Sequence, residues 1–150
     1  MSFQAGAWWC CALPPAFHWN RSNLNTIPLR QKRILLVDDE PGVRKAIALL
    51  LSLDEHQVTE AADGAQALEL FAPERFDLVI TDLTMPEVRG DELACRIRHL
   101  APRQPIVMIT AYQPQRGPSN PVDAILQKPP SLAELRREIA AALSRPHESN

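Results

Sequence analysis

The sequence has few cysteines, and their spacing matches no metal-binding or redox motif. The three cysteines are Cys10, Cys11 and Cys95, and no Cys-x-x-Cys pair occurs. Zinc-ligand and dithiol chemistry are therefore disfavoured. Reduced thiols in a cytosolic protein are the expected state.

The sequence also lacks a long apolar run and an excess of basic charge. No stretch approaches the roughly 18 apolar residues that a membrane-spanning helix needs, and no Lys or Arg precedes Arg21, so the basic start of a signal peptide is missing. The 16 basic and 18 acidic residues give a formal net charge of −2. This balance predicts no basic surface for nucleic acid or anionic lipid. We expect a cytoplasmic protein that binds neither DNA nor membrane directly.

Residues 1–30 differ in composition from the rest of the chain. All three tryptophans lie there, beside a Cys-Cys and a Pro-Pro pair, and no helical or strand period fits this segment. We expect a disordered N-terminal tail, with a partner-binding aromatic segment as the alternative. The chain is 45% hydrophobic, which is enough to bury one core. A single domain is expected over residues 31–146, followed by a short tail at 147–150.

Short apolar runs alternate with helical patterns along this domain. The expected strands are 33–37, 57–61, 77–81, 105–109 and 123–126. Helical patterns follow all of them except the fourth, which is followed by a span, 112–121, that contains three prolines. Helix interiors tolerate proline poorly, so this span is expected to be shortened or irregular. Alternating strands and helices predict parallel crossovers, and hence an α/β fold with a doubly wound, five-stranded parallel sheet.

Polar residues stand at the ends of four of these strands, namely Asp38, Asp39, Asp82, Thr110 and Lys128. Because the carboxyl ends of parallel strands meet at one edge, these side chains are expected to converge there. Three carboxylates repel one another unless a cation neutralises them, and hard oxygen ligands suit Mg²⁺. A carboxylate can also act as a nucleophile and form an aspartyl-phosphate. The ordinary alternatives are an acidic pair in a solvated turn and a solvated lysine.

The sequence resembles the receiver domain of bacterial two-component response regulators from about Gln31 to Arg145. The matching segments are ILLVDDEPGVR, AADGAQALEL, DLVITDLTMPEVRG, IVMITAY and LQKPPSLAEL. The resemblance implies a flavodoxin-like sheet with strand order 2-1-3-4-5. It also implies a phosphoacceptor in a phosphorelay, which receives phosphate from a sensor histidine kinase or a histidine phosphotransfer protein. Such a protein catalyses only its own phosphoryl transfer and dephosphorylation, and is not an enzyme with a separate substrate.

The resemblance implies a role for each acidic residue. Asp82 would be the phosphoacceptor. Asp39, Asp82 and the backbone carbonyl of Thr84 would bind Mg²⁺ directly, and Asp38 would act largely through metal-bound water. These four residues form the expected metal site.

The resemblance also covers the other side of the expected site. Lys128 and Thr110 would bind the phosphoryl group, Ala111 would leave the site open, and the Lys128–Pro129 bond would be cis. Ile125 stands where the family usually has the aromatic partner of the threonine. The usual relay through that ring is therefore not expected here.

Three functions are compatible with these residues. The first, which we expect, is a stand-alone phosphoacceptor that has no DNA-binding output domain and signals by contact with a downstream protein. The second is a phosphatase or phosphotransferase with an aspartyl-phosphate intermediate. Such an enzyme needs a substrate cap, and the chain has no insertion long enough to build one unless the N-terminal tail does so. The third is a binding module whose phosphorylation is vestigial, and the complete set of strand-end residues argues against it.

Overall fold

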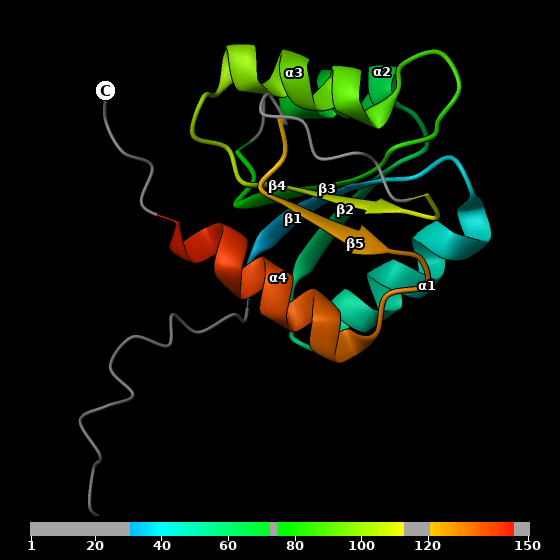
Figure 1. The fold of residues 1–150 in the computed structure, drawn as a ribbon, viewed down its shortest axis with the longest axis vertical. Coiled ribbons are helices and arrows are strands. Elements are labelled where there is room, and N and C mark those ends of the chain that lie inside the picture. Colours follow the sequence, from blue (N-terminus) through cyan, green and yellow to red (C-terminus); the bar gives the residue numbers. More distant parts are fainter. Residues whose placement is uncertain (1–30, 73–74, 113–120, 146–150) are drawn as a thin grey trace, which may run out of the picture.

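The structure is a computed structural model that describes residues 31–72, 75–112 and 121–145. Within these ranges five strands and four helices follow one another (Figure 1). In that part of the chain no helix is both long enough and apolar enough to span a bilayer. The elements are β1 (Arg33–Val37), α1 (Pro41–Ser52), β2 (Gln57–Ala61), α2 (Gly64–Phe71), β3 (Leu78–Asp82), α3 (Gly90–Leu100), β4 (Ile106–Thr110), β5 (Ala124–Gln127) and α4 (Leu132–Ser144).

The strands form one parallel sheet in the order β2-β1-β3-β4-β5, as predicted. Helices α2 and α3 cover one face, and α1 and α4 cover the other (Figure 1). The observed β1 and β2 have the predicted bounds, whereas β3, β4 and β5 each begin and end one residue later than predicted. Asp82 and Thr110 are consequently the last residues of their strands.

The apolar runs form strands because the sheet is buried on both faces. In β1, Leu35 and Val37 pack into the core beneath α2 and α3, while Ile34 and Leu36 pack into the core beneath α1 and α4. All four side chains are buried. A strand covered on both sides has no position for a solvated side chain, so its sequence is continuously apolar.

Two predicted helix starts are confirmed. Pro41 is the first residue of α1, where its fixed backbone angle suits the first turn. Ser131 and Glu134 form a capping box at the start of α4, in which each side chain accepts a hydrogen bond from the other residue's backbone N–H. The tails at 1–30 and 147–150 and most of the proline-containing span, residues 113–120, lie outside the described residues, so the expectations for them stay predictions.

The connection from β3 to α3 folds back against the end of its own strand. The Gly90 N–H donates to the carbonyl of Leu83 at 3.0 Å. A Cβ atom at Gly90 would lie 1.9 Å from the carbonyl oxygen of Asp82. Only a residue without a side chain lets the helix begin this close to the strand. Gly90 therefore fixes where α3 starts relative to Asp82.

We predict that Gly90→Ala lowers the free energy of unfolding by about 3 kcal/mol, because backbone must move to admit the methyl group. Gly42→Ala is the matched control, since a Cβ there would meet nothing within 4 Å. That change should stabilise the protein by up to about 1 kcal/mol, because alanine favours the helical backbone. Urea denaturation of both variants measures the difference. Equal stability of the two variants would contradict the close approach.

Candidate functional site

The sheet order brings the predicted site residues to one edge. Strands β1, β3, β4 and β5 are successive neighbours in the sheet. Asp38 directly follows β1, Asp82 ends β3, Thr110 ends β4, and Lys128 directly follows β5. All four therefore lie at the carboxyl ends of parallel strands, where open α/β sheets bind ligands.

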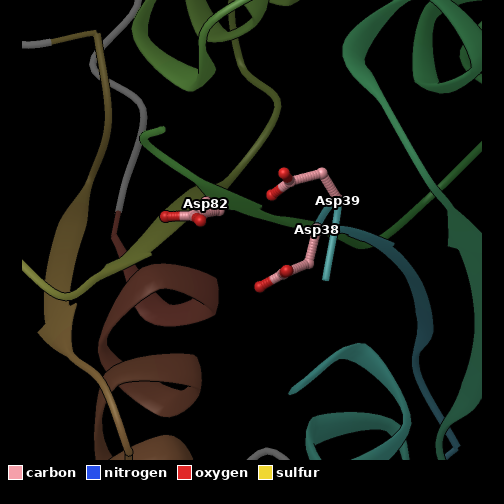
Figure 2. A group of neighbouring side chains, drawn as sticks. All are labelled: Asp38, Asp39 and Asp82. Carbon is pink, nitrogen blue, oxygen red and sulfur yellow. The ribbon is translucent and has the colours of Figure 1, made fainter. Parts of the chain in front are cut away.

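The three predicted carboxylates form a tight cluster (Figure 2). Asp38, Asp39 and Asp82 each offer an oxygen, and these oxygens lie within 4.8 Å of one another. Asp38 and Asp82 are buried, with exposures of 1% and 8%, whereas Asp39 is exposed. Like charges this close and this poorly solvated require a positive partner.

Lys128 supplies that positive charge. Its Nζ lies 2.6 Å from Oδ2 of Asp38 and 2.8 Å from Oδ2 of Asp82. Burial by itself lowers the pKa of Lys128, but the hydrogen bonds and charges of Asp38 and Asp82 outweigh it, and the net pKa is raised. The ammonium is therefore charged at neutral pH, and it bridges two of the three acids.

Asp38 is held by its backbone as well as by its side chain. Its N–H donates to the carbonyl of Ala61 at 3.2 Å, which extends the pairing between β1 and β2 by one residue. Its Oδ1 accepts a hydrogen bond from the N–H of Glu40 at 2.9 Å. The turn between β1 and α1 is thus fixed around this carboxylate.

The structure also describes the other residues that the sequence analysis singled out. Thr110 is buried, and its hydroxyl accepts a hydrogen bond from the N–H of Tyr112 at 3.2 Å. Thr84 and Ala111 are exposed. The Lys128–Pro129 bond is cis, as the resemblance implies. Ile125, in place of the usual aromatic residue, is half-buried and packs against the core beneath α2 and α3.

The donor set fits a hard divalent cation. Three carboxylates within reach of one point, one of them exposed, offer oxygen ligands and leave room for water. This is the combination that Mg²⁺ prefers. A carboxylate at the end of a buried strand, next to a fixed ammonium, can also act as a nucleophile toward phosphorus.

Sequence reasoning missed two charged residues next to the cluster. Arg44, in α1, donates to the backbone carbonyl of Asp38 at 2.6 Å and to Oε2 of Glu60 in β2 at 3.0 Å. Arg44 occurs in the first matching segment, but nothing in the linear sequence pairs it with Glu60. The pairing becomes visible only when β2 is known to lie beside β1.

A groove of about 710 Å³ lies elsewhere on the molecule. Its lining includes Phe71, Phe76, Leu100 and Pro105. Every lining residue comes from the chain just before β3 or β4, so the groove opens at the amino ends of the strands. It is separate from the carboxylate cluster, which lies at the carboxyl ends.

We predict that Lys128→Met lowers the free energy of unfolding by about 2 to 3 kcal/mol at neutral pH, because two buried carboxylates lose their shared cation. Mg²⁺ should restore part of this loss by supplying a replacement charge. Lys45→Met, at an exposed position of α1, makes the same charge change and should have little effect. Thermal or urea denaturation with and without Mg²⁺ is the measurement. An unchanged stability in Lys128→Met would show that the bridge does not compensate the acids.

Comparison with known proteins identifies the family. A family model of the response regulator receiver domain matches residues 34–140. The response regulator MprA of Mycolicibacterium vanbaalenii is 36% identical over 117 residues, which cover 75% of this chain and 51% of MprA. The transcriptional regulatory protein GlrR of Escherichia coli is 39% identical over 79 residues, which cover 53% of this chain and 18% of GlrR. The chain thus spans about half or less of the length of these curated relatives.

Solved structures agree with the sequence comparison. The response regulator TrrA of Thermotoga maritima, solved in complex with Mg²⁺-BeF, has a TM-score of 0.71 and 33% identity, covering 75% of this chain and all of TrrA. TrrA solved in complex with the histidine kinase ThkA has a TM-score of 0.69 and 34% identity, with coverage of 76% of this chain and all of TrrA. The matched family model, the five-stranded sheet and the carboxylates at its edge lead to one conclusion: this chain belongs to the receiver domain family of two-component response regulators.

Proposed function

We propose that the chain is a Mg²⁺-dependent phosphoacceptor, and that Asp82 receives the phosphoryl group from a histidine kinase or a histidine phosphotransfer protein. The observation that supports this most strongly is the bridge from Lys128 to Asp38 and Asp82 within a cluster of three carboxylates. A purely structural ion pair needs only one acid. The third acid, Asp39, is exposed and takes no part in the Lys128 bridge. An exposed carboxylate beside the bridge suits a ligand-binding role.

The proposed step is a displacement at phosphorus. One carboxylate oxygen of Asp82 forms a bond to phosphorus, and the bond from phosphorus to the donor's nitrogen or acyl oxygen breaks with its electron pair. The transition state is loose, so positioning and charge neutralisation supply most of the acceleration. Asp39, Asp82 and the backbone carbonyl of Thr84 would hold Mg²⁺ directly, and Asp38 would act largely through metal-bound water. The cation would supply positive charge that offsets the negative charge of the phosphoryl oxygens.

Lys128 and Thr110 would receive the other phosphoryl oxygens. The Lys128 ammonium is already 2.8 Å from Asp82, so it needs no large movement to pair with a group attached there. The Thr110 hydroxyl accepts a hydrogen bond from Tyr112, which leaves its own proton available to donate. Both contacts would stabilise the negative charge on the phosphoryl oxygens in the transition state of the transfer.

The kinase partner is supported by the complex of the similar protein TrrA with the histidine kinase ThkA. A location in the cytoplasm belongs to this proposal. We also propose that the protein catalyses only its own phosphorylation and dephosphorylation, and that it passes the phosphoryl group to no small-molecule substrate. The expected absence of an output domain is not part of the proposal, because GlrR is a transcriptional regulatory protein of which this chain spans 18%.

We predict that acetyl phosphate adds one phosphoryl group to the protein only when Mg²⁺ is present. Asp82→Asn should abolish the addition, since the amide is not a nucleophile. Asp77→Asn is the matched control: Asp77 is an exposed carboxylate immediately before β3 that accepts a hydrogen bond from the N–H of Arg33. This variant should be labelled like the wild type. Intact mass spectrometry measures the added mass.

Two results would argue against the assignment. Undiminished labelling of Asp82→Asn would exclude Asp82 as the acceptor, and equal labelling with and without Mg²⁺ would exclude the metal requirement. Sustained release of phosphate from phosphoesters in excess over protein would instead support the phosphatase alternative.

A further inference from the structure

Arg44 connects three parts of the chain beside the carboxylate cluster. It lies in the first turns of α1, and only 14% of its side chain is exposed. Its Nη1 donates to the backbone carbonyl of Asp38 at 2.6 Å, and its Nε donates to Oε2 of Glu60 at 3.0 Å. One guanidinium thus joins α1, the turn after β1, and β2.

The carbonyl that Arg44 holds belongs to the peptide bond between Asp38 and Asp39. A peptide unit is planar and includes the Cα atoms of both residues. A hydrogen bond to this oxygen therefore restrains the directions in which the Asp38 and Asp39 side chains leave the main chain. The N–H of Asp38 is held separately by Ala61 at 3.2 Å. The main chain is therefore restrained on both sides of the first carboxylate of the cluster.

Glu60 orients the guanidinium that makes this contact. In the register of the sheet, Glu60 lies opposite Leu36, two residues before Asp38. Its carboxylate is 40% exposed, so the ion pair itself contributes little to stability. The hydrogen bond nevertheless orients the planar guanidinium of Arg44, because this one group donates to both Glu60 and the carbonyl of Asp38.

We propose that Arg44 is a positioning residue that aims Asp38 and Asp39 at a shared cation and thereby raises the affinity of the cluster for Mg²⁺. This inference rests on the proposed function, because it assumes that the cluster binds Mg²⁺. Groups that orient metal ligands from outside commonly change metal affinity strongly when they are removed. Arg44 does so through a main-chain carbonyl, and it touches none of the three carboxylates in the described contacts.

Because Arg44 is positively charged, the direction in which the Mg²⁺ dissociation constant changes on its removal tests the proposal. A guanidinium next to a cation site repels the cation, so removing a mere neighbouring charge would tighten Mg²⁺ binding. Removing a group that positions two ligands would weaken it. The two roles therefore predict opposite changes in the same dissociation constant.

The experiment is a calorimetric titration of the full chain with MgCl₂. We expect the dissociation constant of Arg44→Met to rise about tenfold. Arg44→Lys should recover little of the loss, since an ammonium keeps the charge but cannot span both acceptors as a planar fork. The matched control is Arg136→Met, which removes the same group from an exposed pair with Asp54 that links α4 to the segment after α1. That control should leave Mg²⁺ binding unchanged.

Glu60→Gln is the second variant, and it applies even if Arg44→Met does not fold. It leaves Arg44 itself unchanged and removes the charge of its partner, so it should weaken Mg²⁺ binding less than Arg44→Met does. Unchanged or tighter binding in a folded Arg44→Met protein, or an unchanged constant in Glu60→Gln where Arg44→Met fails to fold, would overturn the proposal.

A metal-free measurement separates this inference from the proposed function. The N–H of Glu40 donates to Oδ1 of Asp38, so its hydrogen exchange reports how firmly the turn is held. Arg44→Met should accelerate exchange at Glu40 without Mg²⁺, and Arg136→Met should not. If the wild type binds no Mg²⁺, the proposed function and the affinity claim both fail, but faster Glu40 exchange would still show that Arg44 orders the turn. Unchanged exchange at Glu40 would show that it does not.

Discussion

The site depends on one electrostatic constraint, the need to neutralise carboxylates that the fold brings together. Asp38 and Asp82 are almost fully buried, and Asp39 offers an oxygen within 4.8 Å of theirs. Lys128 offsets part of that charge through contacts of 2.6 and 2.8 Å. One ammonium against three carboxylates leaves the cluster negative, and this excess is what makes a cation and then a phosphoryl group favourable partners.

The fold supplies this constraint through strand order and through close packing at the ends of strands. Strand β1 lies between β2 and β3, so the turn that carries Asp38 has β2 on one side and Asp82 on the other. Gly90 lets α3 begin against the carbonyl of Asp82, where a Cβ would lie 1.9 Å away. Arg44, in α1, donates a hydrogen bond to the backbone carbonyl of Asp38. The acids are thus fixed from several elements, as preorganised charge stabilisation requires.

Apolar runs and strand-end polar residues are local signals, so the sequence predicted the parallel sheet and the convergence of Asp38, Asp39, Asp82, Thr110 and Lys128. The strand order came from the resemblance to receiver domains and not from any local pattern. The capping box at Ser131 was also readable, since its two residues are three positions apart. The ends of β3, β4 and β5 were predicted one residue too early because each strand continues past its apolar run onto a polar residue, namely Asp82, Thr110 and Gln127. The Arg44–Glu60 contact and the approach of Gly90 to Asp82 were missed because they depend on how elements pack, which no local pattern records.

The most direct test of the central claim is a titration of ¹⁵N-labelled protein with Mg²⁺ followed by NMR. If the carboxylate cluster binds one cation next to Lys128, saturable shift changes should concentrate at the amides of residues 38–40, 82–85 and 128. They should fit a single binding curve. Changes spread over exposed acids such as Asp91 and Glu92 on α3, or no saturable change near Asp82, would contradict the account.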